Sequence, residues 1–280
     1  MTKETSLSSL SPREVTKTAE GLIEFPPEII LVFDFEGTQE ENSMVRLKAG
    51  VTGDVAGATM KEEADDVMDL RAAIAALIYH SSLYDGKKRP KVCCFAGAHK
   101  PGGKAGSAKV KEHLHGFGIK EEDIITTETT ITTNTDIMQL HSLMRLLHMT
   151  SAAIVTTDEH IPRTEQERIN HFNTHINAYL KAHGTDYKMP TIYVVGPSSP
   201  QLKELEYNGI EQDMMEKKVQ PRIEELKSHV TPGGLTEKIA YLLSRFPWLK
   251  KYIQPLAERI SHPYTPIKLK IIKELAGMRI

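Results

Sequence analysis

The feature that most constrains the fold is a repeated alternation of short apolar runs and amphipathic stretches between about residues 28 and 196. The runs are rich in β-branched side chains and apolar almost throughout, which is typical of strands buried on both faces of a parallel sheet. The sequence therefore predicts five buried strands. The predicted strands are Ile29–Phe35, Val92–Ala96, Ile124–Thr127, Ala152–Thr156 and Thr191–Val195.

Amphipathic stretches between these runs predict helices over 62–83, 106–117, 135–148 and 164–183. Alternation of this kind indicates βαβ units with right-handed crossovers. We therefore expect an α/β fold, a three-layer sandwich around a mostly parallel five-stranded sheet. The domain would span residues 28–199, between a polar N-terminal segment over 1–27 and a helical C-terminal extension over 200–280.

Composition excludes several classes of protein. A chain of 280 residues is long enough to bury a sizeable core. A net charge of −2 argues against a general nucleic-acid coat, so no nucleic-acid partner is expected. The two cysteines, Cys93 and Cys94, are neighbours on a predicted strand and point to opposite faces. They are poor partners for a disulfide, which suits a reducing compartment.

The N-terminal residues 1–20 are polar and lack the apolar region of a secretory signal. No apolar run approaches the roughly 20 residues needed to cross a bilayer, so no transmembrane segment is expected. These two features together predict a cytoplasmic protein.

Charge is distributed unevenly along the chain. Residues 1–199 carry 21 Lys and Arg against 27 Asp and Glu, whereas residues 200–280 carry 14 against 10. A basic tail could meet an anionic partner or a membrane surface. Because its apolar residues recur at helical spacing, we favour docking of the tail on the domain or in a homo-oligomer interface.

Polar residues follow the first two strands, where ligands bind in open parallel sheets. Asp34 and Glu36 could bind a ribose or a metal, or cap a loop. The segment 37–59 predicts either an active-site lid or an ordinary insertion. Glycines and lysines over 97–107 predict an anion-binding loop, with a plain flexible turn as the alternative. The loop's candidate ligand-binding residues are Gly97, Lys100, Gly102, Gly103, Lys104 and Ser107.

The third and fourth strands are also followed by polar residues. Glu128, Asn134 and Thr135 follow the third; capping of the next helix explains Asn134 or Thr135 alone but not the whole polar run. After the fourth strand, His160 could act as a general acid or base and Arg163 could clamp a phosphate or carboxylate. The alternative is a solvated loop that starts a helix. The further candidates there are Thr156, Thr157 and Asp158.

Several of these residues resemble one bacterial family. The segment VTTDEHIPR (155–163) is similar to the V-T-S/T-x-x-H-x-P-R motif of the SanA/YdcF-like domain, and Thr132-Thr133-Asn134-Thr135 is similar to its S-x-N-T motif. Leu70-Arg71 resembles the start of its R-L-x-x-A-x-x-L-Y helix, and Phe95-Ala96-Gly97 stands where it has Ser-Gly-Gly. The resemblance covers about 30–195 and implies a Rossmann-like fold. It implies site positions at Arg71, Gly97, Asn134, Thr135, Thr156, His160 and Arg163.

The chain also departs from the family pattern. Asp34-Phe35-Glu36-Gly37 replaces a glycine-rich entry after the first strand, and Asp136-Ile137 replaces the expected Glu-Asn. The resemblance implies a ligand site whose chemistry has changed. Family members have been linked to S-adenosylmethionine and to envelope functions, so S-adenosylmethionine is a candidate cofactor, although no GxGxxG-type loop is present.

Together the residues predict a protein that binds a nucleotide-like or phosphate-bearing small molecule. The basic groups at this edge, Arg71, Lys100, Lys104 and Arg163, predict a locally positive site. One hypothesis is an enzyme, a hydrolase or transferase that uses His160, Arg163 and Asn134. The alternative is a non-catalytic sensor or accessory module. No paired spacing such as HExxH is present, so no metal is required.

Overall fold

The computed structural model describes residues 22, 24–34, 53–97, 105–130, 133–171, 190–229 and 245–246. Within them the chain forms a five-stranded sheet in which every pairing is parallel. The predicted α/β fold is therefore confirmed. The strands are β1 (Ile29–Val32), β2 (Lys91–Ala96), β3 (Ile124–Thr130), β4 (Ser151–Val155) and β5 (Thr191–Val195).

The order of the strands reverses once across the sheet, which runs β3-β2-β1-β4-β5. The chain moves outward from β1 through β2 to β3 and then returns to the other side of β1 to form β4 and β5. The reversal lies between β1 and β4, where Ile29 pairs with Ala152 and Val32 pairs with Val155. In open parallel sheets, ligands bind beyond the carboxyl ends of the strands at such a reversal.

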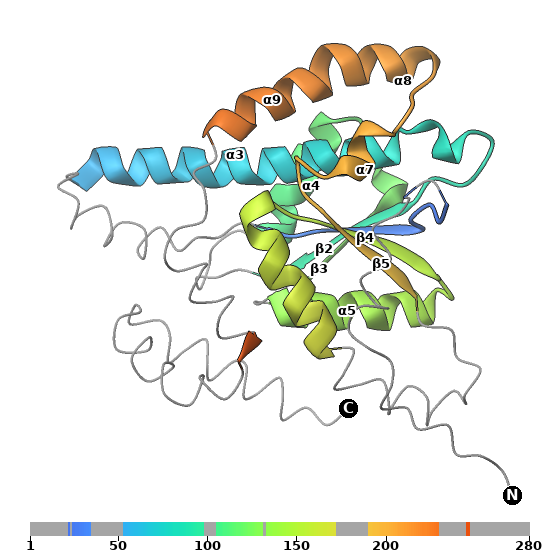
Figure 1. Cartoon of the computed structure of the whole chain (residues 1–280). Coiled ribbons are helices and arrows are strands. Elements are labelled where there is room, and N and C mark those ends of the chain that lie inside the picture. The colour runs from blue at the N-terminus through green and yellow to red at the C-terminus, as the bar shows by residue number, and fades with distance from the viewer. Residues whose placement is uncertain are drawn as a thin grey trace, which may run out of the picture.

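Helices cover both faces of the sheet (Figure 1). Helices α3 (Gly53–Tyr79) and α4 (Gly106–Gly116) cover one face, and α5 (Thr133–Leu146) and a helix over 161–171 cover the other. Cys93 packs in the core beneath α5 and Cys94 in the core beneath α3, so the predicted opposite orientation of the two cysteines is confirmed. Both are free thiols.

Among the predicted boundaries that were wrong, three have a clear physical reason. Strand β1 ends at Val32, because the Phe33 and Asp34 carbonyls accept hydrogen bonds from Arg71 instead. Strand β3 continues to Thr130, since β-branched threonines suit a strand. Helix α3 begins at Gly53, inside the predicted loop 37–59, because the Ala, Met and Glu residues that follow outweigh the glycines.

The first part of the C-terminal extension forms a further helical layer on α3 (Figure 1). It comprises α7 (Pro200–Lys203), α8 (Gly209–Met214), a π-helical turn (Met215–Val219) and α9 (Gln220–His229). Met215, Val219 and Leu226 are fully buried beneath it. The predicted basic excess lies elsewhere, because residues 200–229 carry five Lys and Arg against seven Asp and Glu. Nearly all of residues 230–280 lies outside the described residues.

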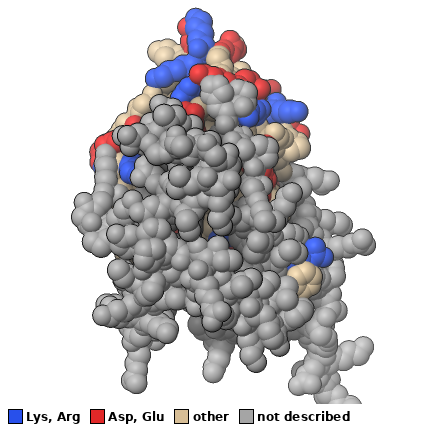
Figure 2. Space-filling model, turned by 90° about the vertical axis from the view of Figure 1, so that its left-hand side faces the viewer, with Lys and Arg blue, Asp and Glu red and all other residues tan. Residues whose placement is uncertain are grey.

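Ion pairs hold this layer in place. Arg222 of α9 bonds Asp69 of α3 at 2.7 Å, and His113 of α4 lies 3.0 Å from the same carboxylate. Burial alone would raise the pKa of Asp69, but these two hydrogen bonds hold its pKa below the ordinary value. Figure 2 shows Lys and Arg interspersed with Asp and Glu at the top of its view, so this described surface carries both signs of charge. No described helix has the length and apolarity of a membrane span.

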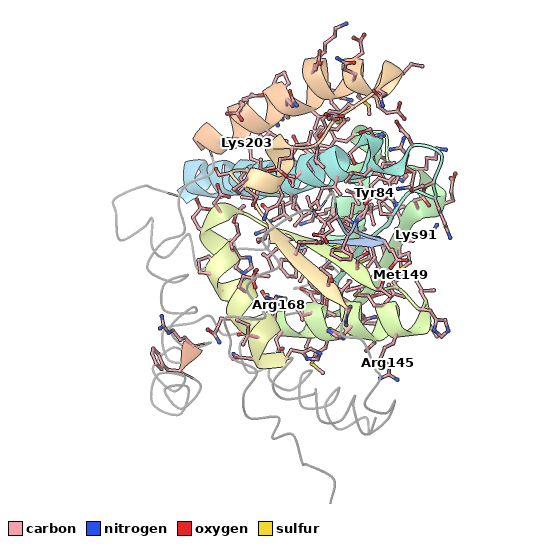
Figure 3. All side chains as sticks on the ribbon, turned by 45° about the vertical axis from the view of Figure 1, so that its right-hand side comes forward. Tyr84, Lys91, Arg145, Met149, Arg168 and Lys203 are labelled. Atoms are coloured by element: carbon pink, nitrogen blue, oxygen red, sulfur yellow. The ribbon has the colours of Figure 1, made fainter. Side chains whose placement is uncertain are left out.

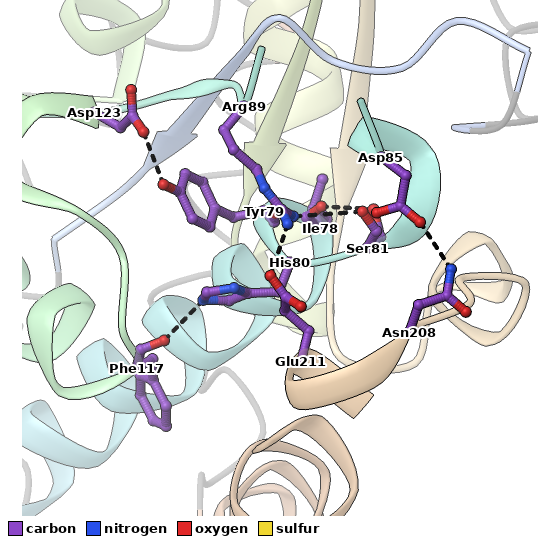
Figure 4. A network of polar contacts seen from close by, with 10 residues as sticks. All are labelled: Ile78, Tyr79, His80, Ser81, Asp85, Arg89, Phe117, Asp123, Asn208 and Glu211. Atoms are coloured by element: carbon purple, nitrogen blue, oxygen red, sulfur yellow. Dashed lines mark hydrogen bonds and ion pairs between the residues drawn. The ribbon is translucent and has the colours of Figure 1, made fainter. Parts of the chain in front are cut away.

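Arg89 joins the C-terminal end of α3 to α8 (Figure 4). Its Nη1 donates to the Tyr79 carbonyl at 2.6 Å and to the Ser81 carbonyl at 3.5 Å, and its Nη2 bonds Glu211 at 2.9 Å. A cation suits this position because the last carbonyls of a helix lack partners within the helix. Beside it, the Tyr79 hydroxyl donates to Asp123 at 2.7 Å. This network fixes the end of α3 that lies farthest from the carboxyl ends of the strands.

We expect Arg89→Met to lower the free energy of unfolding by about 1.5–3 kcal/mol, because it removes charged hydrogen bonds to buried carbonyls. Glu211→Gln is the matched variant on the other side of the ion pair. It should cost only about 0–1 kcal/mol, because the Glu211 side chain is 38% exposed. Urea unfolding of the full chain measures both. Equal losses would show that the ion pair, and not the capping of α3, carries the stability.

Candidate functional site

The candidate site lies at the carboxyl ends of β1 and β4. Figure 3 shows Lys91 and Met149, which begin or precede strands, at one end of the sheet together with Arg145. Arg168 and Lys203, from the helices that follow β4 and β5, lie toward the other end. That second end carries the residues that follow β1 and β4, so the topology brings together Asp34 and the segment 156–163.

His160 is held by contacts from both strands of the reversal. It ends a 3-10 turn (Asp158–His160) in which its N–H donates to the Thr157 carbonyl at 3.0 Å. Its Nδ1 lies 2.9 Å from the Thr156 hydroxyl, directly after β4. Its ring also contacts Phe33, directly after β1, with 5.7 Å between ring centroids. The imidazole is therefore fixed in position and orientation.

Arg71 reaches this edge from α3 and is only 2% exposed. Its Nη1 donates to the Asp34 carbonyl at 2.6 Å and to the Phe33 carbonyl at 3.3 Å. The resemblance implied a site position here. The contacts give Arg71 a structural role, because the guanidinium fixes the backbone where β1 ends and keeps a buried positive charge near His160.

The surroundings of His160 keep its imidazole neutral. Burial lowers the pKa of His160 well below the ordinary value, and the positive charges of Arg71 and Arg163 lower this pKa further. At neutral pH the ring is therefore uncharged, and the two guanidinium groups supply the positive potential. An anionic group beside them would offset both effects, since a negative charge favours the protonated ring.

Two carboxylates lie toward the other strands. Asp34 packs against Gly106 at the N-terminus of α4. Ala105, the residue before this helix, makes no side-chain hydrogen bond to its N-terminus. A negative charge is favourable at such an end. Asp136, in the first turn of α5, accepts a hydrogen bond from the Thr130 hydroxyl. Among the described residues, the edge therefore holds charges of both signs, and two of the basic residues of the predicted locally positive site, Lys100 and Lys104, lie outside the described residues.

Some predicted ligand-binding residues have clear structural roles. Gly97 lies against β3, where a Cβ would come within 2.8 Å of the Glu128 carbonyl. Asp158 accepts a hydrogen bond from the Ser198 N–H at 3.1 Å and so joins the turn after β4 to the loop after β5. Ser107 is buried in the first turn of α4, next to the glycine that contacts Asp34.

Other predicted residues are not brought to His160. Glu128 is exposed on β3, three strand positions from β4 and thus about 14 Å away. Asn134 is exposed in the first turn of α5, the helix that contacts β2 and β3, and Thr135 follows it. Thr157 is buried, and its carbonyl closes the turn that carries His160. The remaining predicted residues lie outside the described residues: Glu36, Lys100, Gly102, Gly103 and Lys104.

Two buried residues at the carboxyl edge of the sheet did not emerge as candidates from the sequence. Phe33 reads as an ordinary apolar strand residue, and nothing in its type indicates contact with an imidazole. Asp136 could have been found, because acidic residues are common in the first turn of a helix but are rarely buried there.

The cysteines do not supply a nucleophile. Burial raises the pKa of both the Cys93 and the Cys94 thiols, so neither is a thiolate at neutral pH. Within the described parts of the chain, no group of three or more His, Cys, Asp and Glu residues is arranged to hold a metal ion.

The fold and the site define a doubly wound α/β protein with a neutral histidine and two arginines at the reversal of strand order. Comparison with known proteins finds no matching family model, curated protein or solved structure. The geometry of the site therefore carries the functional argument.

We expect Arg163→Gln to raise the pKa of His160, because it removes one of the two positive charges that disfavour the imidazolium. In the unaltered chain, this pKa should lie below 6.5, the ordinary value for a histidine. An NMR titration of the ring signals, assigned with His160→Gln, measures both values. An unchanged pKa in Arg163→Gln would place Arg163 too far away to act on the ring.

Gly97→Ala should lower the free energy of unfolding by about 1–3 kcal/mol, because the added methyl group meets the backbone of β3 rather than a flexible side chain. Gly116→Ala is the control, since nothing lies within 4 Å of a Cβ at Gly116. It should be neutral or gain roughly 0.5–1 kcal/mol. If Gly97→Ala keeps full stability in urea unfolding, the packing role of Gly97 is refuted.

Proposed function

We propose that this protein binds a small molecule with an anionic group, phosphate-bearing or nucleotide-like, at the carboxyl ends of β1 and β4. Arg163 binds the anion, and His160 contacts the same group. Arg71 contributes its buried charge while it holds the end of β1. The single observation that supports this most is the neutral imidazole beside two guanidinium groups at the reversal of strand order.

The energetic argument is that the negative charge of the ligand compensates for the positive charge near His160. Burial and the positive charges of Arg71 and Arg163 lower the pKa of His160, so positive charge at this edge of the sheet disfavours a protonated ring. A phosphate or carboxylate accepts bidentate hydrogen bonds from a guanidinium such as that of Arg163, which a lysine cannot offer. The negative charge of the ligand thus interacts favourably with the positive charge near His160, which favours binding there.

A second candidate function is hydrolysis or transfer of the bound group, with His160 moving a proton. One observation favours it: the imidazole is neutral at the pH of the cell, so a proton can be exchanged during a reaction. Turnover assays with phosphate monoesters and nucleotides distinguish the two functions. Binding that survives in His160→Gln together with loss of turnover supports catalysis, and binding without turnover in the unaltered chain supports a sensor.

The resemblance to the SanA/YdcF-like domain supports the same edge of the sheet, since His160 and Arg163 stand in its most specific motif. It also brings S-adenosylmethionine and an envelope-related accessory role into the proposal as alternatives. Calorimetry with S-adenosylmethionine, with AMP and with inorganic phosphate separates these ligands directly. Heat with S-adenosylmethionine alone would favour the alternative ligand over a phosphate-bearing one.

Sulfate is a suitable probe of the anion site because its own charge does not change over the pH range of the experiment. We expect Arg163→Gln to weaken sulfate binding about tenfold or more, the value of a charged hydrogen bond. Binding by the unaltered chain should tighten as the pH falls from 7.5 to 5.5. The sign follows because bound sulfate raises the pKa of His160, so the complex takes up a proton that the free protein does not hold. Isothermal titration calorimetry measures both effects.

Arg145→Gln is the matched control for this experiment. Arg145 is exposed in the last turn of α5, at the opposite end of the sheet, so its loss should leave sulfate affinity unchanged. His160→Gln should remove most of the pH dependence while it retains part of the affinity. Equal weakening by Arg145→Gln and Arg163→Gln would reduce the binding to general surface electrostatics and refute the site.

A further inference from the structure

The loop after β5 lies directly against the 3-10 turn that follows β4. The Thr156 N–H donates to the Val195 carbonyl at 2.9 Å, so the two segments are still joined where β4 ends. The next residue of the loop, Gly196, is buried. A Cβ at this position would lie 2.8 Å from Ile161 Cδ1 and 3.2 Å from the backbone nitrogen of Asp158. A glycine is therefore needed for the loop to come this close to the turn.

The Asp158 carboxylate joins the turn to this loop. Its Oδ1 accepts a hydrogen bond from the Ser198 N–H at 3.1 Å. The same oxygen would be the atom nearest to a Cβ at Gly196, so the glycine leaves the space that the carboxylate occupies. A charged acceptor makes a hydrogen bond roughly twice as strong as a neutral one. Asp158 and Gly196 therefore contribute to one contact, which a change at either residue can break.

The loop has hydrogen bonds of its own that hold it in place. The Gly196 N–H donates to Ser199 Oγ at 2.8 Å, and the Ser199 N–H donates to the Gly196 carbonyl at 3.0 Å. Ser199 is buried, and the chain enters α7 at Pro200 directly after it. Asp158 is thus attached to a loop that is itself closed at both ends.

The turn, in contrast, depends on contacts with the rest of the fold. It is a single 3-10 turn, in which the His160 N–H donates to the Thr157 carbonyl at 3.0 Å. Hydrogen bonds of this kind are poorly aligned, and one isolated turn has little stability of its own. Asp158 begins the turn, His160 ends it, and Arg163 lies in the helix that follows. A contact at the first residue therefore also determines where the later residues lie.

We propose that Asp158 is a positioning residue of the anion site, which acts by fixing the turn after β4 to the loop after β5. It thereby holds His160 and Arg163 at the edge where the anion binds. This inference rests on the proposed function for its ligand. It gives Asp158 an indirect role in place of the direct ligand contact that the sequence predicts, since a carboxylate in contact with an anion would repel it.

Calorimetry with sulfate on two variants of the full chain tests this role. Asp158→Ala removes the acceptor of the Ser198 N–H, whereas Asp158→Asn keeps an oxygen acceptor in the same place. We expect Asp158→Ala to bind sulfate about three- to tenfold more weakly than Asp158→Asn. Because both variants lose the same charge, the difference between them reports the hydrogen bond. Equal affinities of the two variants would overturn the proposal.

Gly196→Ala breaks the same contact from the side of the loop. The methyl group would meet the ends of the Asp158 and Ile161 side chains, which can move, so the variant should fold with the carboxylate displaced from Ser198. It should weaken sulfate binding relative to the unaltered chain, and it carries the test if Asp158→Ala fails to fold. Combined with Asp158→Ala, it should add little further loss. Fully additive losses would mean that the two residues act separately, against the proposal.

The NMR titration of the His160 ring needs no ligand and so separates this inference from the proposed function. Displacement of the turn should expose the ring, which raises the pKa of His160 toward the ordinary value in Asp158→Ala but not in Asp158→Asn. A raised pKa in a protein whose unaltered chain binds no sulfate would support the role of Asp158 and refute the anion site.

The opposite result is equally clear. If the unaltered chain binds sulfate, and Asp158→Ala and Asp158→Asn match in both sulfate affinity and the pKa of His160, the anion site stands and the role of Asp158 is refuted. A merely structural role would give this result together with a lower free energy of unfolding in Asp158→Ala, measured in urea.

Discussion

The contact between the Arg71 guanidinium and the carbonyls of Phe33 and Asp34 is the interaction on which the rest of the site depends. It ends β1 at Val32, because these carbonyls no longer belong to the sheet ladder. It links α3 to the reversal of strand order. It also keeps a buried positive charge at the edge, where it helps to hold His160 neutral. One side chain therefore holds the end of the strand and adds to the effect of burial on the pKa of His160.

The position of Arg71 depends in turn on layers that are distant from the ligand edge. Arg89 caps the far end of α3 and Arg222 joins α3 to α9, so the helix is held at both its side and its end. The buried residues of β1, β2 and β4 alternate between the two cores, which fixes the register of the sheet beneath it. Arg71 is held in a fixed position because several independent contacts fix α3.

The strands of the sheet are predicted well because the residue pattern that marks a strand lies within a few consecutive positions. Short runs of apolar or β-branched residues mark all five strands, and the polar residues after them include His160 and Arg163. Long-range contacts could not be predicted in this way. Nothing local indicates that Phe33 meets His160, that Asp34 lies at the start of α4, or that Gly97 is needed by β3. Glu128 and Asn134 were predicted for the site because they follow a strand, but the strand order places β3 far from β4.

The most direct test of the anion site is a crystal of the full chain soaked with selenate, a sulfate analogue that is located by its anomalous scattering. The account predicts one ordered selenate beyond the ends of β1 and β4, within hydrogen-bond distance of the Arg163 guanidinium and of the His160 ring. Ordered selenate at other positions, with the Arg163 and His160 side chains well defined and no anomalous signal beside them, would contradict it.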